Sequence, residues 1–340
     1  MTEHTERWAT DGWRTTAEAW IDDALASAGR PRTGPVEEVR VRPWGVVLSA
    51  PTADGTVFMK ATAPGTRFEA GLYELLVRAV PARVLRPLAV DLDAGWLLLP
   101  DGGPTLDAQV EGPALLDALV DVAAQYAQLQ VDLAPAVDDL LAVGVADMRP
   151  ARMLDRFDEA VVNARRYVEA SGRAEEAARV DRVAGFRDVM GRWCDRLTAA
   201  PGIASLDHND LHGGNVFAVA APAGRQCRFF DWGDSVVAHP FATLLVLRSV
   251  VRWVLEVDGD TPEERRVVDA YLEPFGPLGS RAELLEIVDV ACEVGKVARS
   301  LVWARAVEGA GPDDDPEHAS APLDWLLELL SGPLAREAGA

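Results

Sequence analysis

The sequence predicts an α+β protein in which a strand-rich N-terminal lobe precedes a mostly helical C-terminal lobe. Short alternating or apolar runs bounded by turn residues occupy residues 36–99. Longer patterns with helical periodicity dominate residues 105–340. Between them, residues 100–104 read Pro-Asp-Gly-Gly-Pro, which interrupts both patterns. We therefore expect a two-lobed chain with a hinge at 100–104.

The bulk composition is that of an ordinary globular protein. The chain has 340 residues, of which 49% are apolar and 26% are charged, which is enough for two lobes with their own cores. No run of 18 apolar residues occurs, so we expect no membrane span, and the N-terminus lacks the features of a signal peptide. Three widely spaced cysteines support neither a disulfide framework nor a Cys-x-x-Cys metal site. These features predict a soluble, reduced, cytoplasmic protein.

The charge is strongly negative, with a formal net charge of −21. This value argues against nucleic acid or an anionic membrane surface as a partner, and it is compatible with a cationic substrate. Solubility alone also explains such a charge. Lys60 and Lys296 are the only lysines, so each indicates a position where the planar fork of arginine would not serve.

The N-terminal elements follow from periodicity and turn residues. Residues 1–35 predict a helical lead-in, with Thr15 or Thr16 as N-cap and Gly29 as its end. The predicted strands cover 36–41, 46–50, 56–61, 83–90 and 96–99, with a helix over 67–80 after the third strand.

The C-terminal lobe is predicted to be helical except for one hairpin. Two short apolar runs, 216–220 and 227–230, flank the turn Pro222-Ala223-Gly224 and predict this hairpin. The predicted helices cover 113–131, 151–171, 174–199, 240–257, 262–272, 281–307 and 321–330.

The chemistry concentrates just before the hairpin. Residues 208–215 read His-Asn-Asp-Leu-His-Gly-Gly-Asn, which fits the catalytic-loop pattern H-x-D-L-x-x-x-N of kinases. In that pattern the aspartate, here Asp210, accepts the proton of the substrate hydroxyl. The asparagine, here Asn215, turns back to the metal ion that neutralises the phosphates.

A second acidic motif follows the hairpin. Asp231 ends an apolar strand and is followed by Trp232 and Gly233, which fits the metal-binding D-x-G pattern. The hairpin is expected to return the chain so that Asn215 and Asp231 face one another. Two oxygen ligands, together with phosphate oxygens and waters, suit Mg²⁺.

A lysine upstream completes the order of motifs. Lys60 ends the apolar run Val57-Phe58-Met59 and resembles the strand lysine that pairs the phosphates of ATP. A glutamate on the following helix is expected to orient it. Glu69, near the start of that helix, is the first choice, and Glu74 is the alternative.

The run from His208 to Val216, followed by Phe230-Asp231-Trp232-Gly233-Asp234, resembles the aminoglycoside phosphotransferase family of the protein-kinase-like superfamily. The resemblance implies a protein-kinase-like fold with a small antiparallel-sheet N-lobe and a mostly helical C-lobe. It implies ATP bound in the cleft, with Mg²⁺ as cofactor and a small-molecule hydroxyl as acceptor.

The same resemblance implies roles for individual residues. Asp210 would be the catalytic base, Asn215 and Asp231 the magnesium ligands, and Lys60 with Glu69 the pair that orients the phosphates. The hinge backbone would hold adenine through the Pro100 carbonyl and the Gly102 N–H.

Two departures from the family pattern concern the nucleotide. Residues 42–45, Arg-Pro-Trp-Gly, replace a glycine-rich loop between the first two strands. In addition, Pro100 has no N–H to donate to adenine.

The histidines near these motifs have structural and chemical interpretations. His208 is expected to support the catalytic loop by hydrogen bonding. His212 would either contact the transferring phosphoryl group or buttress the turn. His239, which precedes Pro240, is expected to cap the next helix.

Two rival functions and the acceptor remain open at the level of sequence. His208, Asp210 and His212 also form H-x-D-x-H, as in a metallohydrolase, and a catalytically inactive nucleotide-binding regulator would share the fold. Charge and family resemblance favour an amine-bearing, cationic acceptor. Its pocket would need several of the acidic residues after the second motif to converge: Glu256, Asp258, Asp260, Asp269, Glu273, Asp289, Glu293 and Glu308.

Overall fold

The structure is a computed structural model that describes residues 3–200, 203–222, 224–257, 260–310 and 315–338. The chain divides into two compact units, the N-terminal unit (Met1–Gly103 with Trp303–Ser320) and the C-terminal unit (Pro104–Val302 with Ala321–Ala340). The division at Gly103 falls within the expected hinge. The grouping of Trp303–Ser320 with the N-terminal unit differs from the sequence expectation, which assigned all of 105–340 to the helical lobe.

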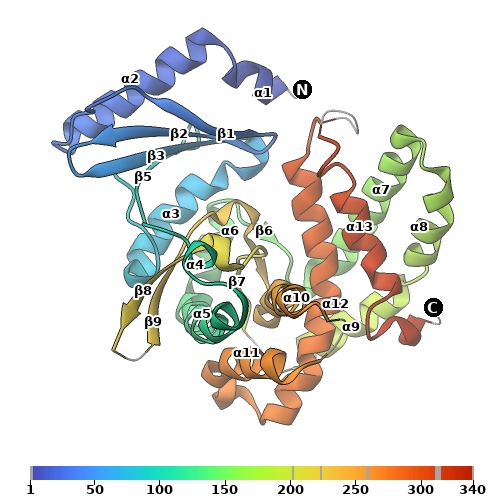
Figure 1. The fold of residues 1–340 in the computed structure, drawn as a ribbon. Coiled ribbons are helices and arrows are strands. Elements are labelled where there is room, and N and C mark those ends of the chain that lie inside the picture. Colours follow the sequence, from blue (N-terminus) through green and yellow to red (C-terminus); the bar gives the residue numbers. More distant parts are fainter. Residues whose placement is uncertain (1–2, 201–202, 223, 258–259, 311–314, 339–340) are drawn as a thin grey trace. The chain divides into compact units, whose positions relative to one another are not determined.

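The N-terminal unit is built on a five-stranded antiparallel sheet with the strand order β1-β2-β3-β5-β4. With the helical remainder of the chain, this sheet confirms the predicted fold class (Figure 1). The strands are β1 (Glu37–Arg42), β2 (Gly45–Thr52), β3 (Gly55–Thr62), β4 (Ala89–Asp91) and β5 (Trp96–Pro100).

The fourth strand is much shorter than predicted. The sequence predicted a strand over 83–90, whereas β4 covers only Ala89–Asp91. Val84 and Leu85 are buried, so their apolar character serves packing and not strand pairing. Pro87 lacks the N–H that a paired strand requires, and the ladder starts beyond it, where the Leu88 N–H donates to the Leu98 carbonyl.

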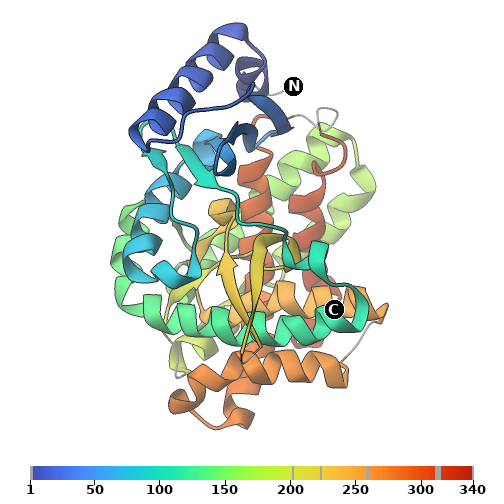
Figure 2. The ribbon, with the colours of Figure 1, turned by 60° about the vertical axis from the view of Figure 1, so that its left-hand side comes forward.

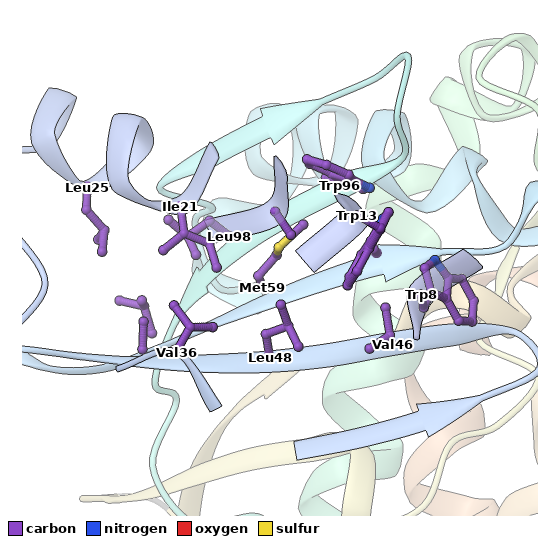
Figure 3. Packing of buried hydrophobic residues seen from close by; sticks show 14 of the residues in the cluster. Trp8, Trp13, Ile21, Leu25, Val36, Val46, Leu48, Met59, Trp96 and Leu98 are labelled. Atoms are coloured by element: carbon purple, nitrogen blue, oxygen red, sulfur yellow. The ribbon is translucent and has the colours of Figure 1, made fainter. Parts of the chain in front are cut away.

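Helices pack against the sheet through large apolar side chains. The helix α2 (Asp11–Ser27) places Trp13, Ile21 and Leu25 against a strand surface that includes Leu48 (Figure 3). In Figure 1, α2 lies on one side of the sheet and α3 (Phe68–Ala79) on the other. A short helix α1 (Glu3–Trp8) precedes α2.

The predicted N-cap of α2 is wrong by more than one turn. Thr10 caps the helix, since its hydroxyl accepts from the Trp13 N–H at 3.3 Å. Thr15 and Thr16 lie inside the helix, where their hydroxyls donate to the carbonyls four residues earlier.

The C-terminal unit is mostly helical. The predicted helix over 174–199 is two helices, broken at Gly185–Phe186, and the short helix α6 was not predicted. Figure 2 shows α5 running beside the β8–β9 hairpin, with α11 packed along α5. The helices are α4 (Leu106–Gln109), α5 (Gly112–Leu133), α6 (Val137–Ala142), α7 (Met153–Ser171), α8 (Ala177–Ala184), α9 (Arg187–Ala199), α10 (Leu244–Leu255), α11 (Pro262–Leu272), α12 (Arg281–Ala306) and α13 (Ala321–Leu327).

Two small strand assemblies interrupt the helices. The predicted hairpin consists of β8 (Val216–Ala221) and β9 (Gly224–Phe229), and Ala223 of its turn lies outside the described residues. A three-stranded sheet of β6 (Ala146–Asp147), β10 (Val236–Ala238) and β7 (Ser205–Asp207) was not predicted. Its strands have two or three residues each, too short to show a periodic pattern. Within the described ranges, no helix is both long and apolar enough to cross a membrane.

Candidate active site

Two loops of the C-terminal unit connect the same two pairs of strands, β7 with β10 at one end and β8 with β9 at the other. The catalytic-loop motif at 208–215 connects β7 to β8, and the second motif at 231–234 connects β9 to β10. At one end, Asp207 of β7 pairs with Val236 of β10. At the other, Val216 pairs with Phe229, and the Phe230 N–H donates to the Asn215 carbonyl at 3.2 Å. Both motifs are therefore anchored side by side by backbone hydrogen bonds.

The carboxylate of Asp210 is contacted at both oxygens. Its Oδ2 accepts from Asn215 Nδ2 at 3.0 Å and lies 3.4 Å from His212 Nε2. Its Oδ1 accepts from Arg299 Nη2 of α12 at 2.6 Å. Burial opposes ionisation of Asp210, but the positive charge of Arg299, followed by the hydrogen bond to His212, outweighs it and lowers the pKa of Asp210. The side chain is 27% exposed, so this ionised carboxylate is accessible.

A buried polar network supports the loop beneath Asp210. Asp207 Oδ1 accepts from the Asn209 N–H at 2.9 Å and from Thr243 Oγ1 at 2.7 Å. His208 Nε2 donates to the Phe230 carbonyl at 3.0 Å, which is the loop support expected from the sequence. Burial lowers the pKa of His208, so its imidazole is neutral and acts as a structural donor.

His212 and His239 both cap short helical turns. His212 Nδ1 accepts from the Gly214 N–H at 3.0 Å, so its Nε2 carries the proton and faces Asp210. This geometry favours the turn-buttressing role for His212, and the hydrogen bond to Asp210 raises the pKa of the imidazole. His239 accepts from the Phe241 N–H at 3.3 Å, which confirms the predicted cap.

The predicted magnesium ligands lie at the same end of the hairpin, because Asn215 directly precedes β8 and Asp231 follows the end of β9. Asn215 is 7% exposed, and its Nδ2 donates to the Asp210 carbonyl at 2.9 Å as well as to the carboxylate. Because both donations use the nitrogen, the amide oxygen is left to act as a ligand. Asp231 has a left-handed backbone with a φ of 62°, a strained conformation for a non-glycine residue. An amide oxygen and a carboxylate at one end of a hairpin fit the oxygen ligands that Mg²⁺ prefers.

In the N-terminal unit, Lys60 and Glu69 form an ion pair. Lys60 lies on β3 opposite Val47 of β2 and Leu97 of β5. Its Nζ lies 2.7 Å from Glu69 Oε2, and the glutamate, in the first turn of α3, is 1% exposed. The alternative partner, Glu74, is exposed on the same helix.

The residues predicted to contact adenine lie at the end of the sheet. Pro100 is the last residue of β5 and pairs with Val57. After it, the Asp101 carboxylate accepts from the Gly103 N–H at 2.8 Å and bends the chain around Gly102. Within the described residues, the Gly102 N–H donates no hydrogen bond to another part of the protein.

The turn that replaces a glycine-rich loop has its own packing partner. Trp44 packs edge-on against Trp303 and His318, with ring centroids 5.8 Å and 5.3 Å apart. Both partners belong to the Trp303–Ser320 segment of the same unit. No local pattern indicated this contact, because its two sides lie more than 250 residues apart in the sequence.

A cavity of about 830 Å³ lies in the C-terminal unit. Three of the acidic residues named from the sequence, Asp260, Asp289 and Glu293, line it. Asp324 and Glu328 of the C-terminal segment also line it and were not named. Of the other named residues, Asp269 pairs with Arg281 at the surface, and Asp258 lies outside the described residues.

The charges in the cavity are partly compensated. Arg248 bridges Asp289 and the buried Glu264, and Lys296 Nζ lies 3.0 Å from both oxygens of Glu293. Five carboxylates and three cationic side chains line the cavity, so its net charge is negative. Trp325 supplies an aromatic wall.

One side chain, that of Arg299, lies between the cavity wall and the predicted base. The Arg299 guanidinium, which binds Asp210, lies 5.8 Å from the centre of the Trp325 ring. Arg299 and the cavity-lining Lys296 are also one turn apart on α12. The described residues that line the cavity belong to neither motif, so the cavity is connected to the predicted base through Trp325 and Arg299.

The metallohydrolase interpretation finds no support in the geometry. The His208 ring donates to a backbone carbonyl, and His212 uses its Nδ1 to cap the turn. In the described part of the chain, three acidic or histidine side chains whose ligand atoms lie close together occur at Asp315, Glu317 and His318, and these residues are not part of the motif. The H-x-D-x-H residues therefore do not converge on one ion.

Comparison with known proteins points to phosphoryl transfer. The model of the phosphotransferase enzyme family matches residues 52–284. A solved macrolide 2'-phosphotransferase type I aligns with a TM-score of 0.59 and 15% identity, covering 92% of this chain and 97% of that one. The choline kinase LicA from Streptococcus pneumoniae aligns with a TM-score of 0.58 and 15% identity, and the alignment covers 92% of this chain and 99% of that one.

An ethanolamine kinase from Plasmodium vivax aligns with a TM-score of 0.58 and 12% identity, covering 89% of this chain and 83% of that one. No curated protein is significantly similar to the chain in sequence. At these identities the structural likeness shows the fold, and the match of the family spans more than half of the chain.

Proposed function

Because the chain belongs to the phosphotransferase enzyme family and is a small-molecule kinase, we propose that it transfers the γ-phosphoryl group of ATP to a hydroxyl of an amine-bearing molecule. The observation that carries the proposal is the placement of Asp210. Its accessible carboxylate is bound to Asn215 on the same loop, and the Asn215 backbone is bound to the residue before Asp231. The proposed base and the two proposed oxygen ligands thus lie in the segments that flank one hairpin, and this arrangement supports the proposal.

In the proposed reaction, Asp210 accepts the proton of the acceptor hydroxyl. The hydroxyl oxygen forms a bond to the γ-phosphorus, and the bond from that phosphorus to the bridging oxygen breaks, releasing ADP. Asn215 and Asp231 would hold Mg²⁺, which neutralises phosphate charge when bound. Lys60, oriented by Glu69, would bind the phosphates as a point charge.

The adenine contacts belong to the same proposal. The Pro100 carbonyl would accept from the base, and the Gly102 N–H would donate to it. Such backbone contacts recognise one edge of the ring and need no particular side chain.

The cavity whose wall is connected to Asp210 through Trp325 and Arg299 supports a cationic acceptor of substantial size. Its volume of about 830 Å³ lies in the range typical of sites for drug-sized ligands. The excess of carboxylates favours ammonium groups, and Trp325 offers an apolar and aromatic surface. A small amino alcohol would leave most of this volume empty, whereas an antibiotic-sized amine would occupy it.

The test is incubation with MgATP and a library of macrolides, aminoglycosides, choline, ethanolamine and neutral sugars, followed by mass detection of phosphorylated product. Asp210→Asn keeps the size of the side chain but loses the basic carboxylate. Its turnover should fall by about 10²–10⁴-fold, while the KM for MgATP changes little. Near-wild-type turnover in this variant would remove Asp210 from its role.

The acceptor class has a separate test. The KM of the acceptor should rise with ionic strength, since salt screens the cavity charges over ~8–10 Å, and the KM for MgATP should rise less. Asp324→Asn, in the cavity wall, should raise the acceptor KM, whereas Glu175→Gln, an exposed residue outside the wall, should not. Efficient phosphorylation of a neutral sugar without a salt effect would contradict the cationic acceptor and leave the kinase assignment intact.

A further inference from the structure

Arg299 reaches the catalytic loop from a distant helix. It lies on α12, 89 residues beyond Asp210 in the sequence, and its side chain is 7% exposed. Three oxygens accept from its guanidinium group: Asp210 Oδ1 at 2.6 Å, Asp234 Oδ2 at 2.8 Å and the Asn209 carbonyl at 2.6 Å. One side chain thus connects both motifs of the site.

The two acceptors in the catalytic loop are the base and the peptide just before it. Asn209 has a φ of 62°, a left-handed backbone conformation that is uncommon for residues other than glycine. Its N–H is held by Asp207, and its carbonyl is held by Arg299. This strained peptide sets the direction in which the Asp210 side chain leaves the backbone, so contacts that stabilise it also aim the base.

The carboxylate itself is fixed by donors on opposite oxygens. Asn215 binds Oδ2 and Arg299 binds Oδ1, which fixes both the rotamer and the plane of the carboxylate. Oδ2 is also approached by His212 Nε2 at 3.4 Å, whereas Oδ1 keeps a second lone-pair direction at which the acceptor hydroxyl can be bound. The charge of Arg299 is balanced by Asp210 and Asp234 together.

We propose that Arg299 is a positioning residue for phosphoryl transfer, which holds Asp210 and the Asn209 peptide in the orientation that the acceptor hydroxyl requires. This proposal rests on the role of Asp210 in the proposed function. In phosphoryl transfer, catalysis comes chiefly from positioning and electrostatics, so orientation of the base is a direct contribution to rate.

The geometry requires arginine. Nη1 donates to Asp234 and the Asn209 carbonyl, and Nη2 donates to Asp210. The planar guanidinium group holds these two nitrogens at a fixed separation, so that they reach acceptors in different directions. A lysine ammonium carries the same charge but places its donors around a single atom, and it cannot span the same three oxygens. Arg299→Lys therefore removes the positioning while keeping the charge.

The experiment measures ADP release from MgATP, with water as acceptor and, in parallel, with the compound from the library that yields phosphorylated product. We expect Arg299→Lys to lower kcat by about 10–100-fold, the scale of a misplacement near 1 Å, with the KM for MgATP within about twofold of wild type. The matched control is Arg149→Lys in the same unit, where Arg149 binds both oxygens of Asp147 away from the loop. That control should retain wild-type kcat.

A double-mutant cycle separates positioning from general destabilisation. If Arg299 acts through Asp210, Arg299→Lys should cause little further loss in the Asp210→Asn background. Additive losses in the cycle, or a wild-type kcat for Arg299→Lys, would overturn the proposal. A wild-type kcat for Asp210→Asn would instead contradict the proposed function and the positioning role with it.

A second variant, Asp234→Asn, tests the proposal if Arg299→Lys does not fold. Asp234→Asn leaves Asp210 and Arg299 in place but weakens one of the three anchors of the guanidinium. Its kcat should fall by several-fold, and this loss should also vanish in the Asp210→Asn background. An unchanged kcat in Asp234→Asn, or a loss that adds to that of Asp210→Asn, would count against the proposal.

Discussion

Lys60 and Glu69 form an ion pair in which Nζ lies 2.7 Å from Oε2 and the glutamate is 1% exposed. The other lysine of the chain, Lys296, is paired in the same way with a glutamate that is 1% exposed, Glu293. Each lysine in this arginine-rich protein thus compensates one buried carboxylate. An ammonium group acts here as a compact point charge, whereas the buried Arg299 uses its planar fork to bind several acceptors at once.

Lys60→Arg is expected to lose most of its activity while remaining folded. The broader guanidinium cannot place one compact charge between Glu69 and a phosphate, so kcat/KM for MgATP should fall about tenfold or more, which corresponds to about 1.4 kcal/mol or more. Steady-state kinetics with circular dichroism as a folding check would measure this. Arg78→Lys, an exposed substitution in the last turn of α3, is the control and should be neutral. An active Lys60→Arg enzyme would refute the role of Lys60.

Asp231→Ala should weaken binding of MgATP more than Asn215→Ala does. The aspartate contributes a full negative charge toward the cation, whereas the asparagine contributes a neutral amide oxygen. Titration of each variant with MgATP, and with ATP in the presence of a chelator, would measure the difference. Equal losses for the two variants would contradict this ranking, and a loss that persists without Mg²⁺ would show that the effect is not on the metal.

Lys296→Met should destabilise the fold by about 3–5 kcal/mol, because it leaves the Glu293 carboxylate buried without its partner. Burial already raises the pKa of Glu293 despite the nearby Lys296. The double variant Lys296→Met/Glu293→Gln should recover part of the loss, since it removes the uncompensated charge. Urea unfolding of the three proteins provides the free energies, and no recovery in the double variant would show that Lys296 stabilises the fold through packing or its hydrogen bond to the Glu328 carbonyl and not through Glu293.

His239 should make the protein less stable in acid. Burial lowers the pKa of His239 to about 4, below the value of about 6.5 for an exposed histidine. The unfolded chain therefore binds more protons between these two values, so stability rises with pH from about 4 to about 6.5 and is unaffected by this group above that range. The full contribution across this range is about 3–4 kcal/mol.

The comparison variant is His239→Asn, which keeps a side-chain acceptor for the Phe241 N–H but does not titrate. Urea midpoints measured from pH 4 to 7 should rise less steeply for His239→Asn than for the wild type. Parallel curves would mean that protonation of His239 is not coupled to unfolding.

The features that the sequence alone determined are local ones. The catalytic loop was recognisable because Asp210 and Asn215 must lie five residues apart on one tight loop. The strands around Lys60 were recognisable because alternation and turn residues are visible within a short window. The same reasoning failed at 83–90, where apolar residues that pack in the core resemble a strand although Pro87 interrupts it.

The tertiary structure alone decided which distant residues meet. Arg299 lies in a long helix whose pattern indicates only packing, and nothing near it in the sequence points to a base 89 residues earlier. The acidic residues of the cavity were visible as a composition, but only the fold separates Asp289 and Glu293 in its wall from Asp269 at the surface. The physical reason is that periodicity reports which side of an element is buried, whereas the partner buried against it depends on how the whole chain packs.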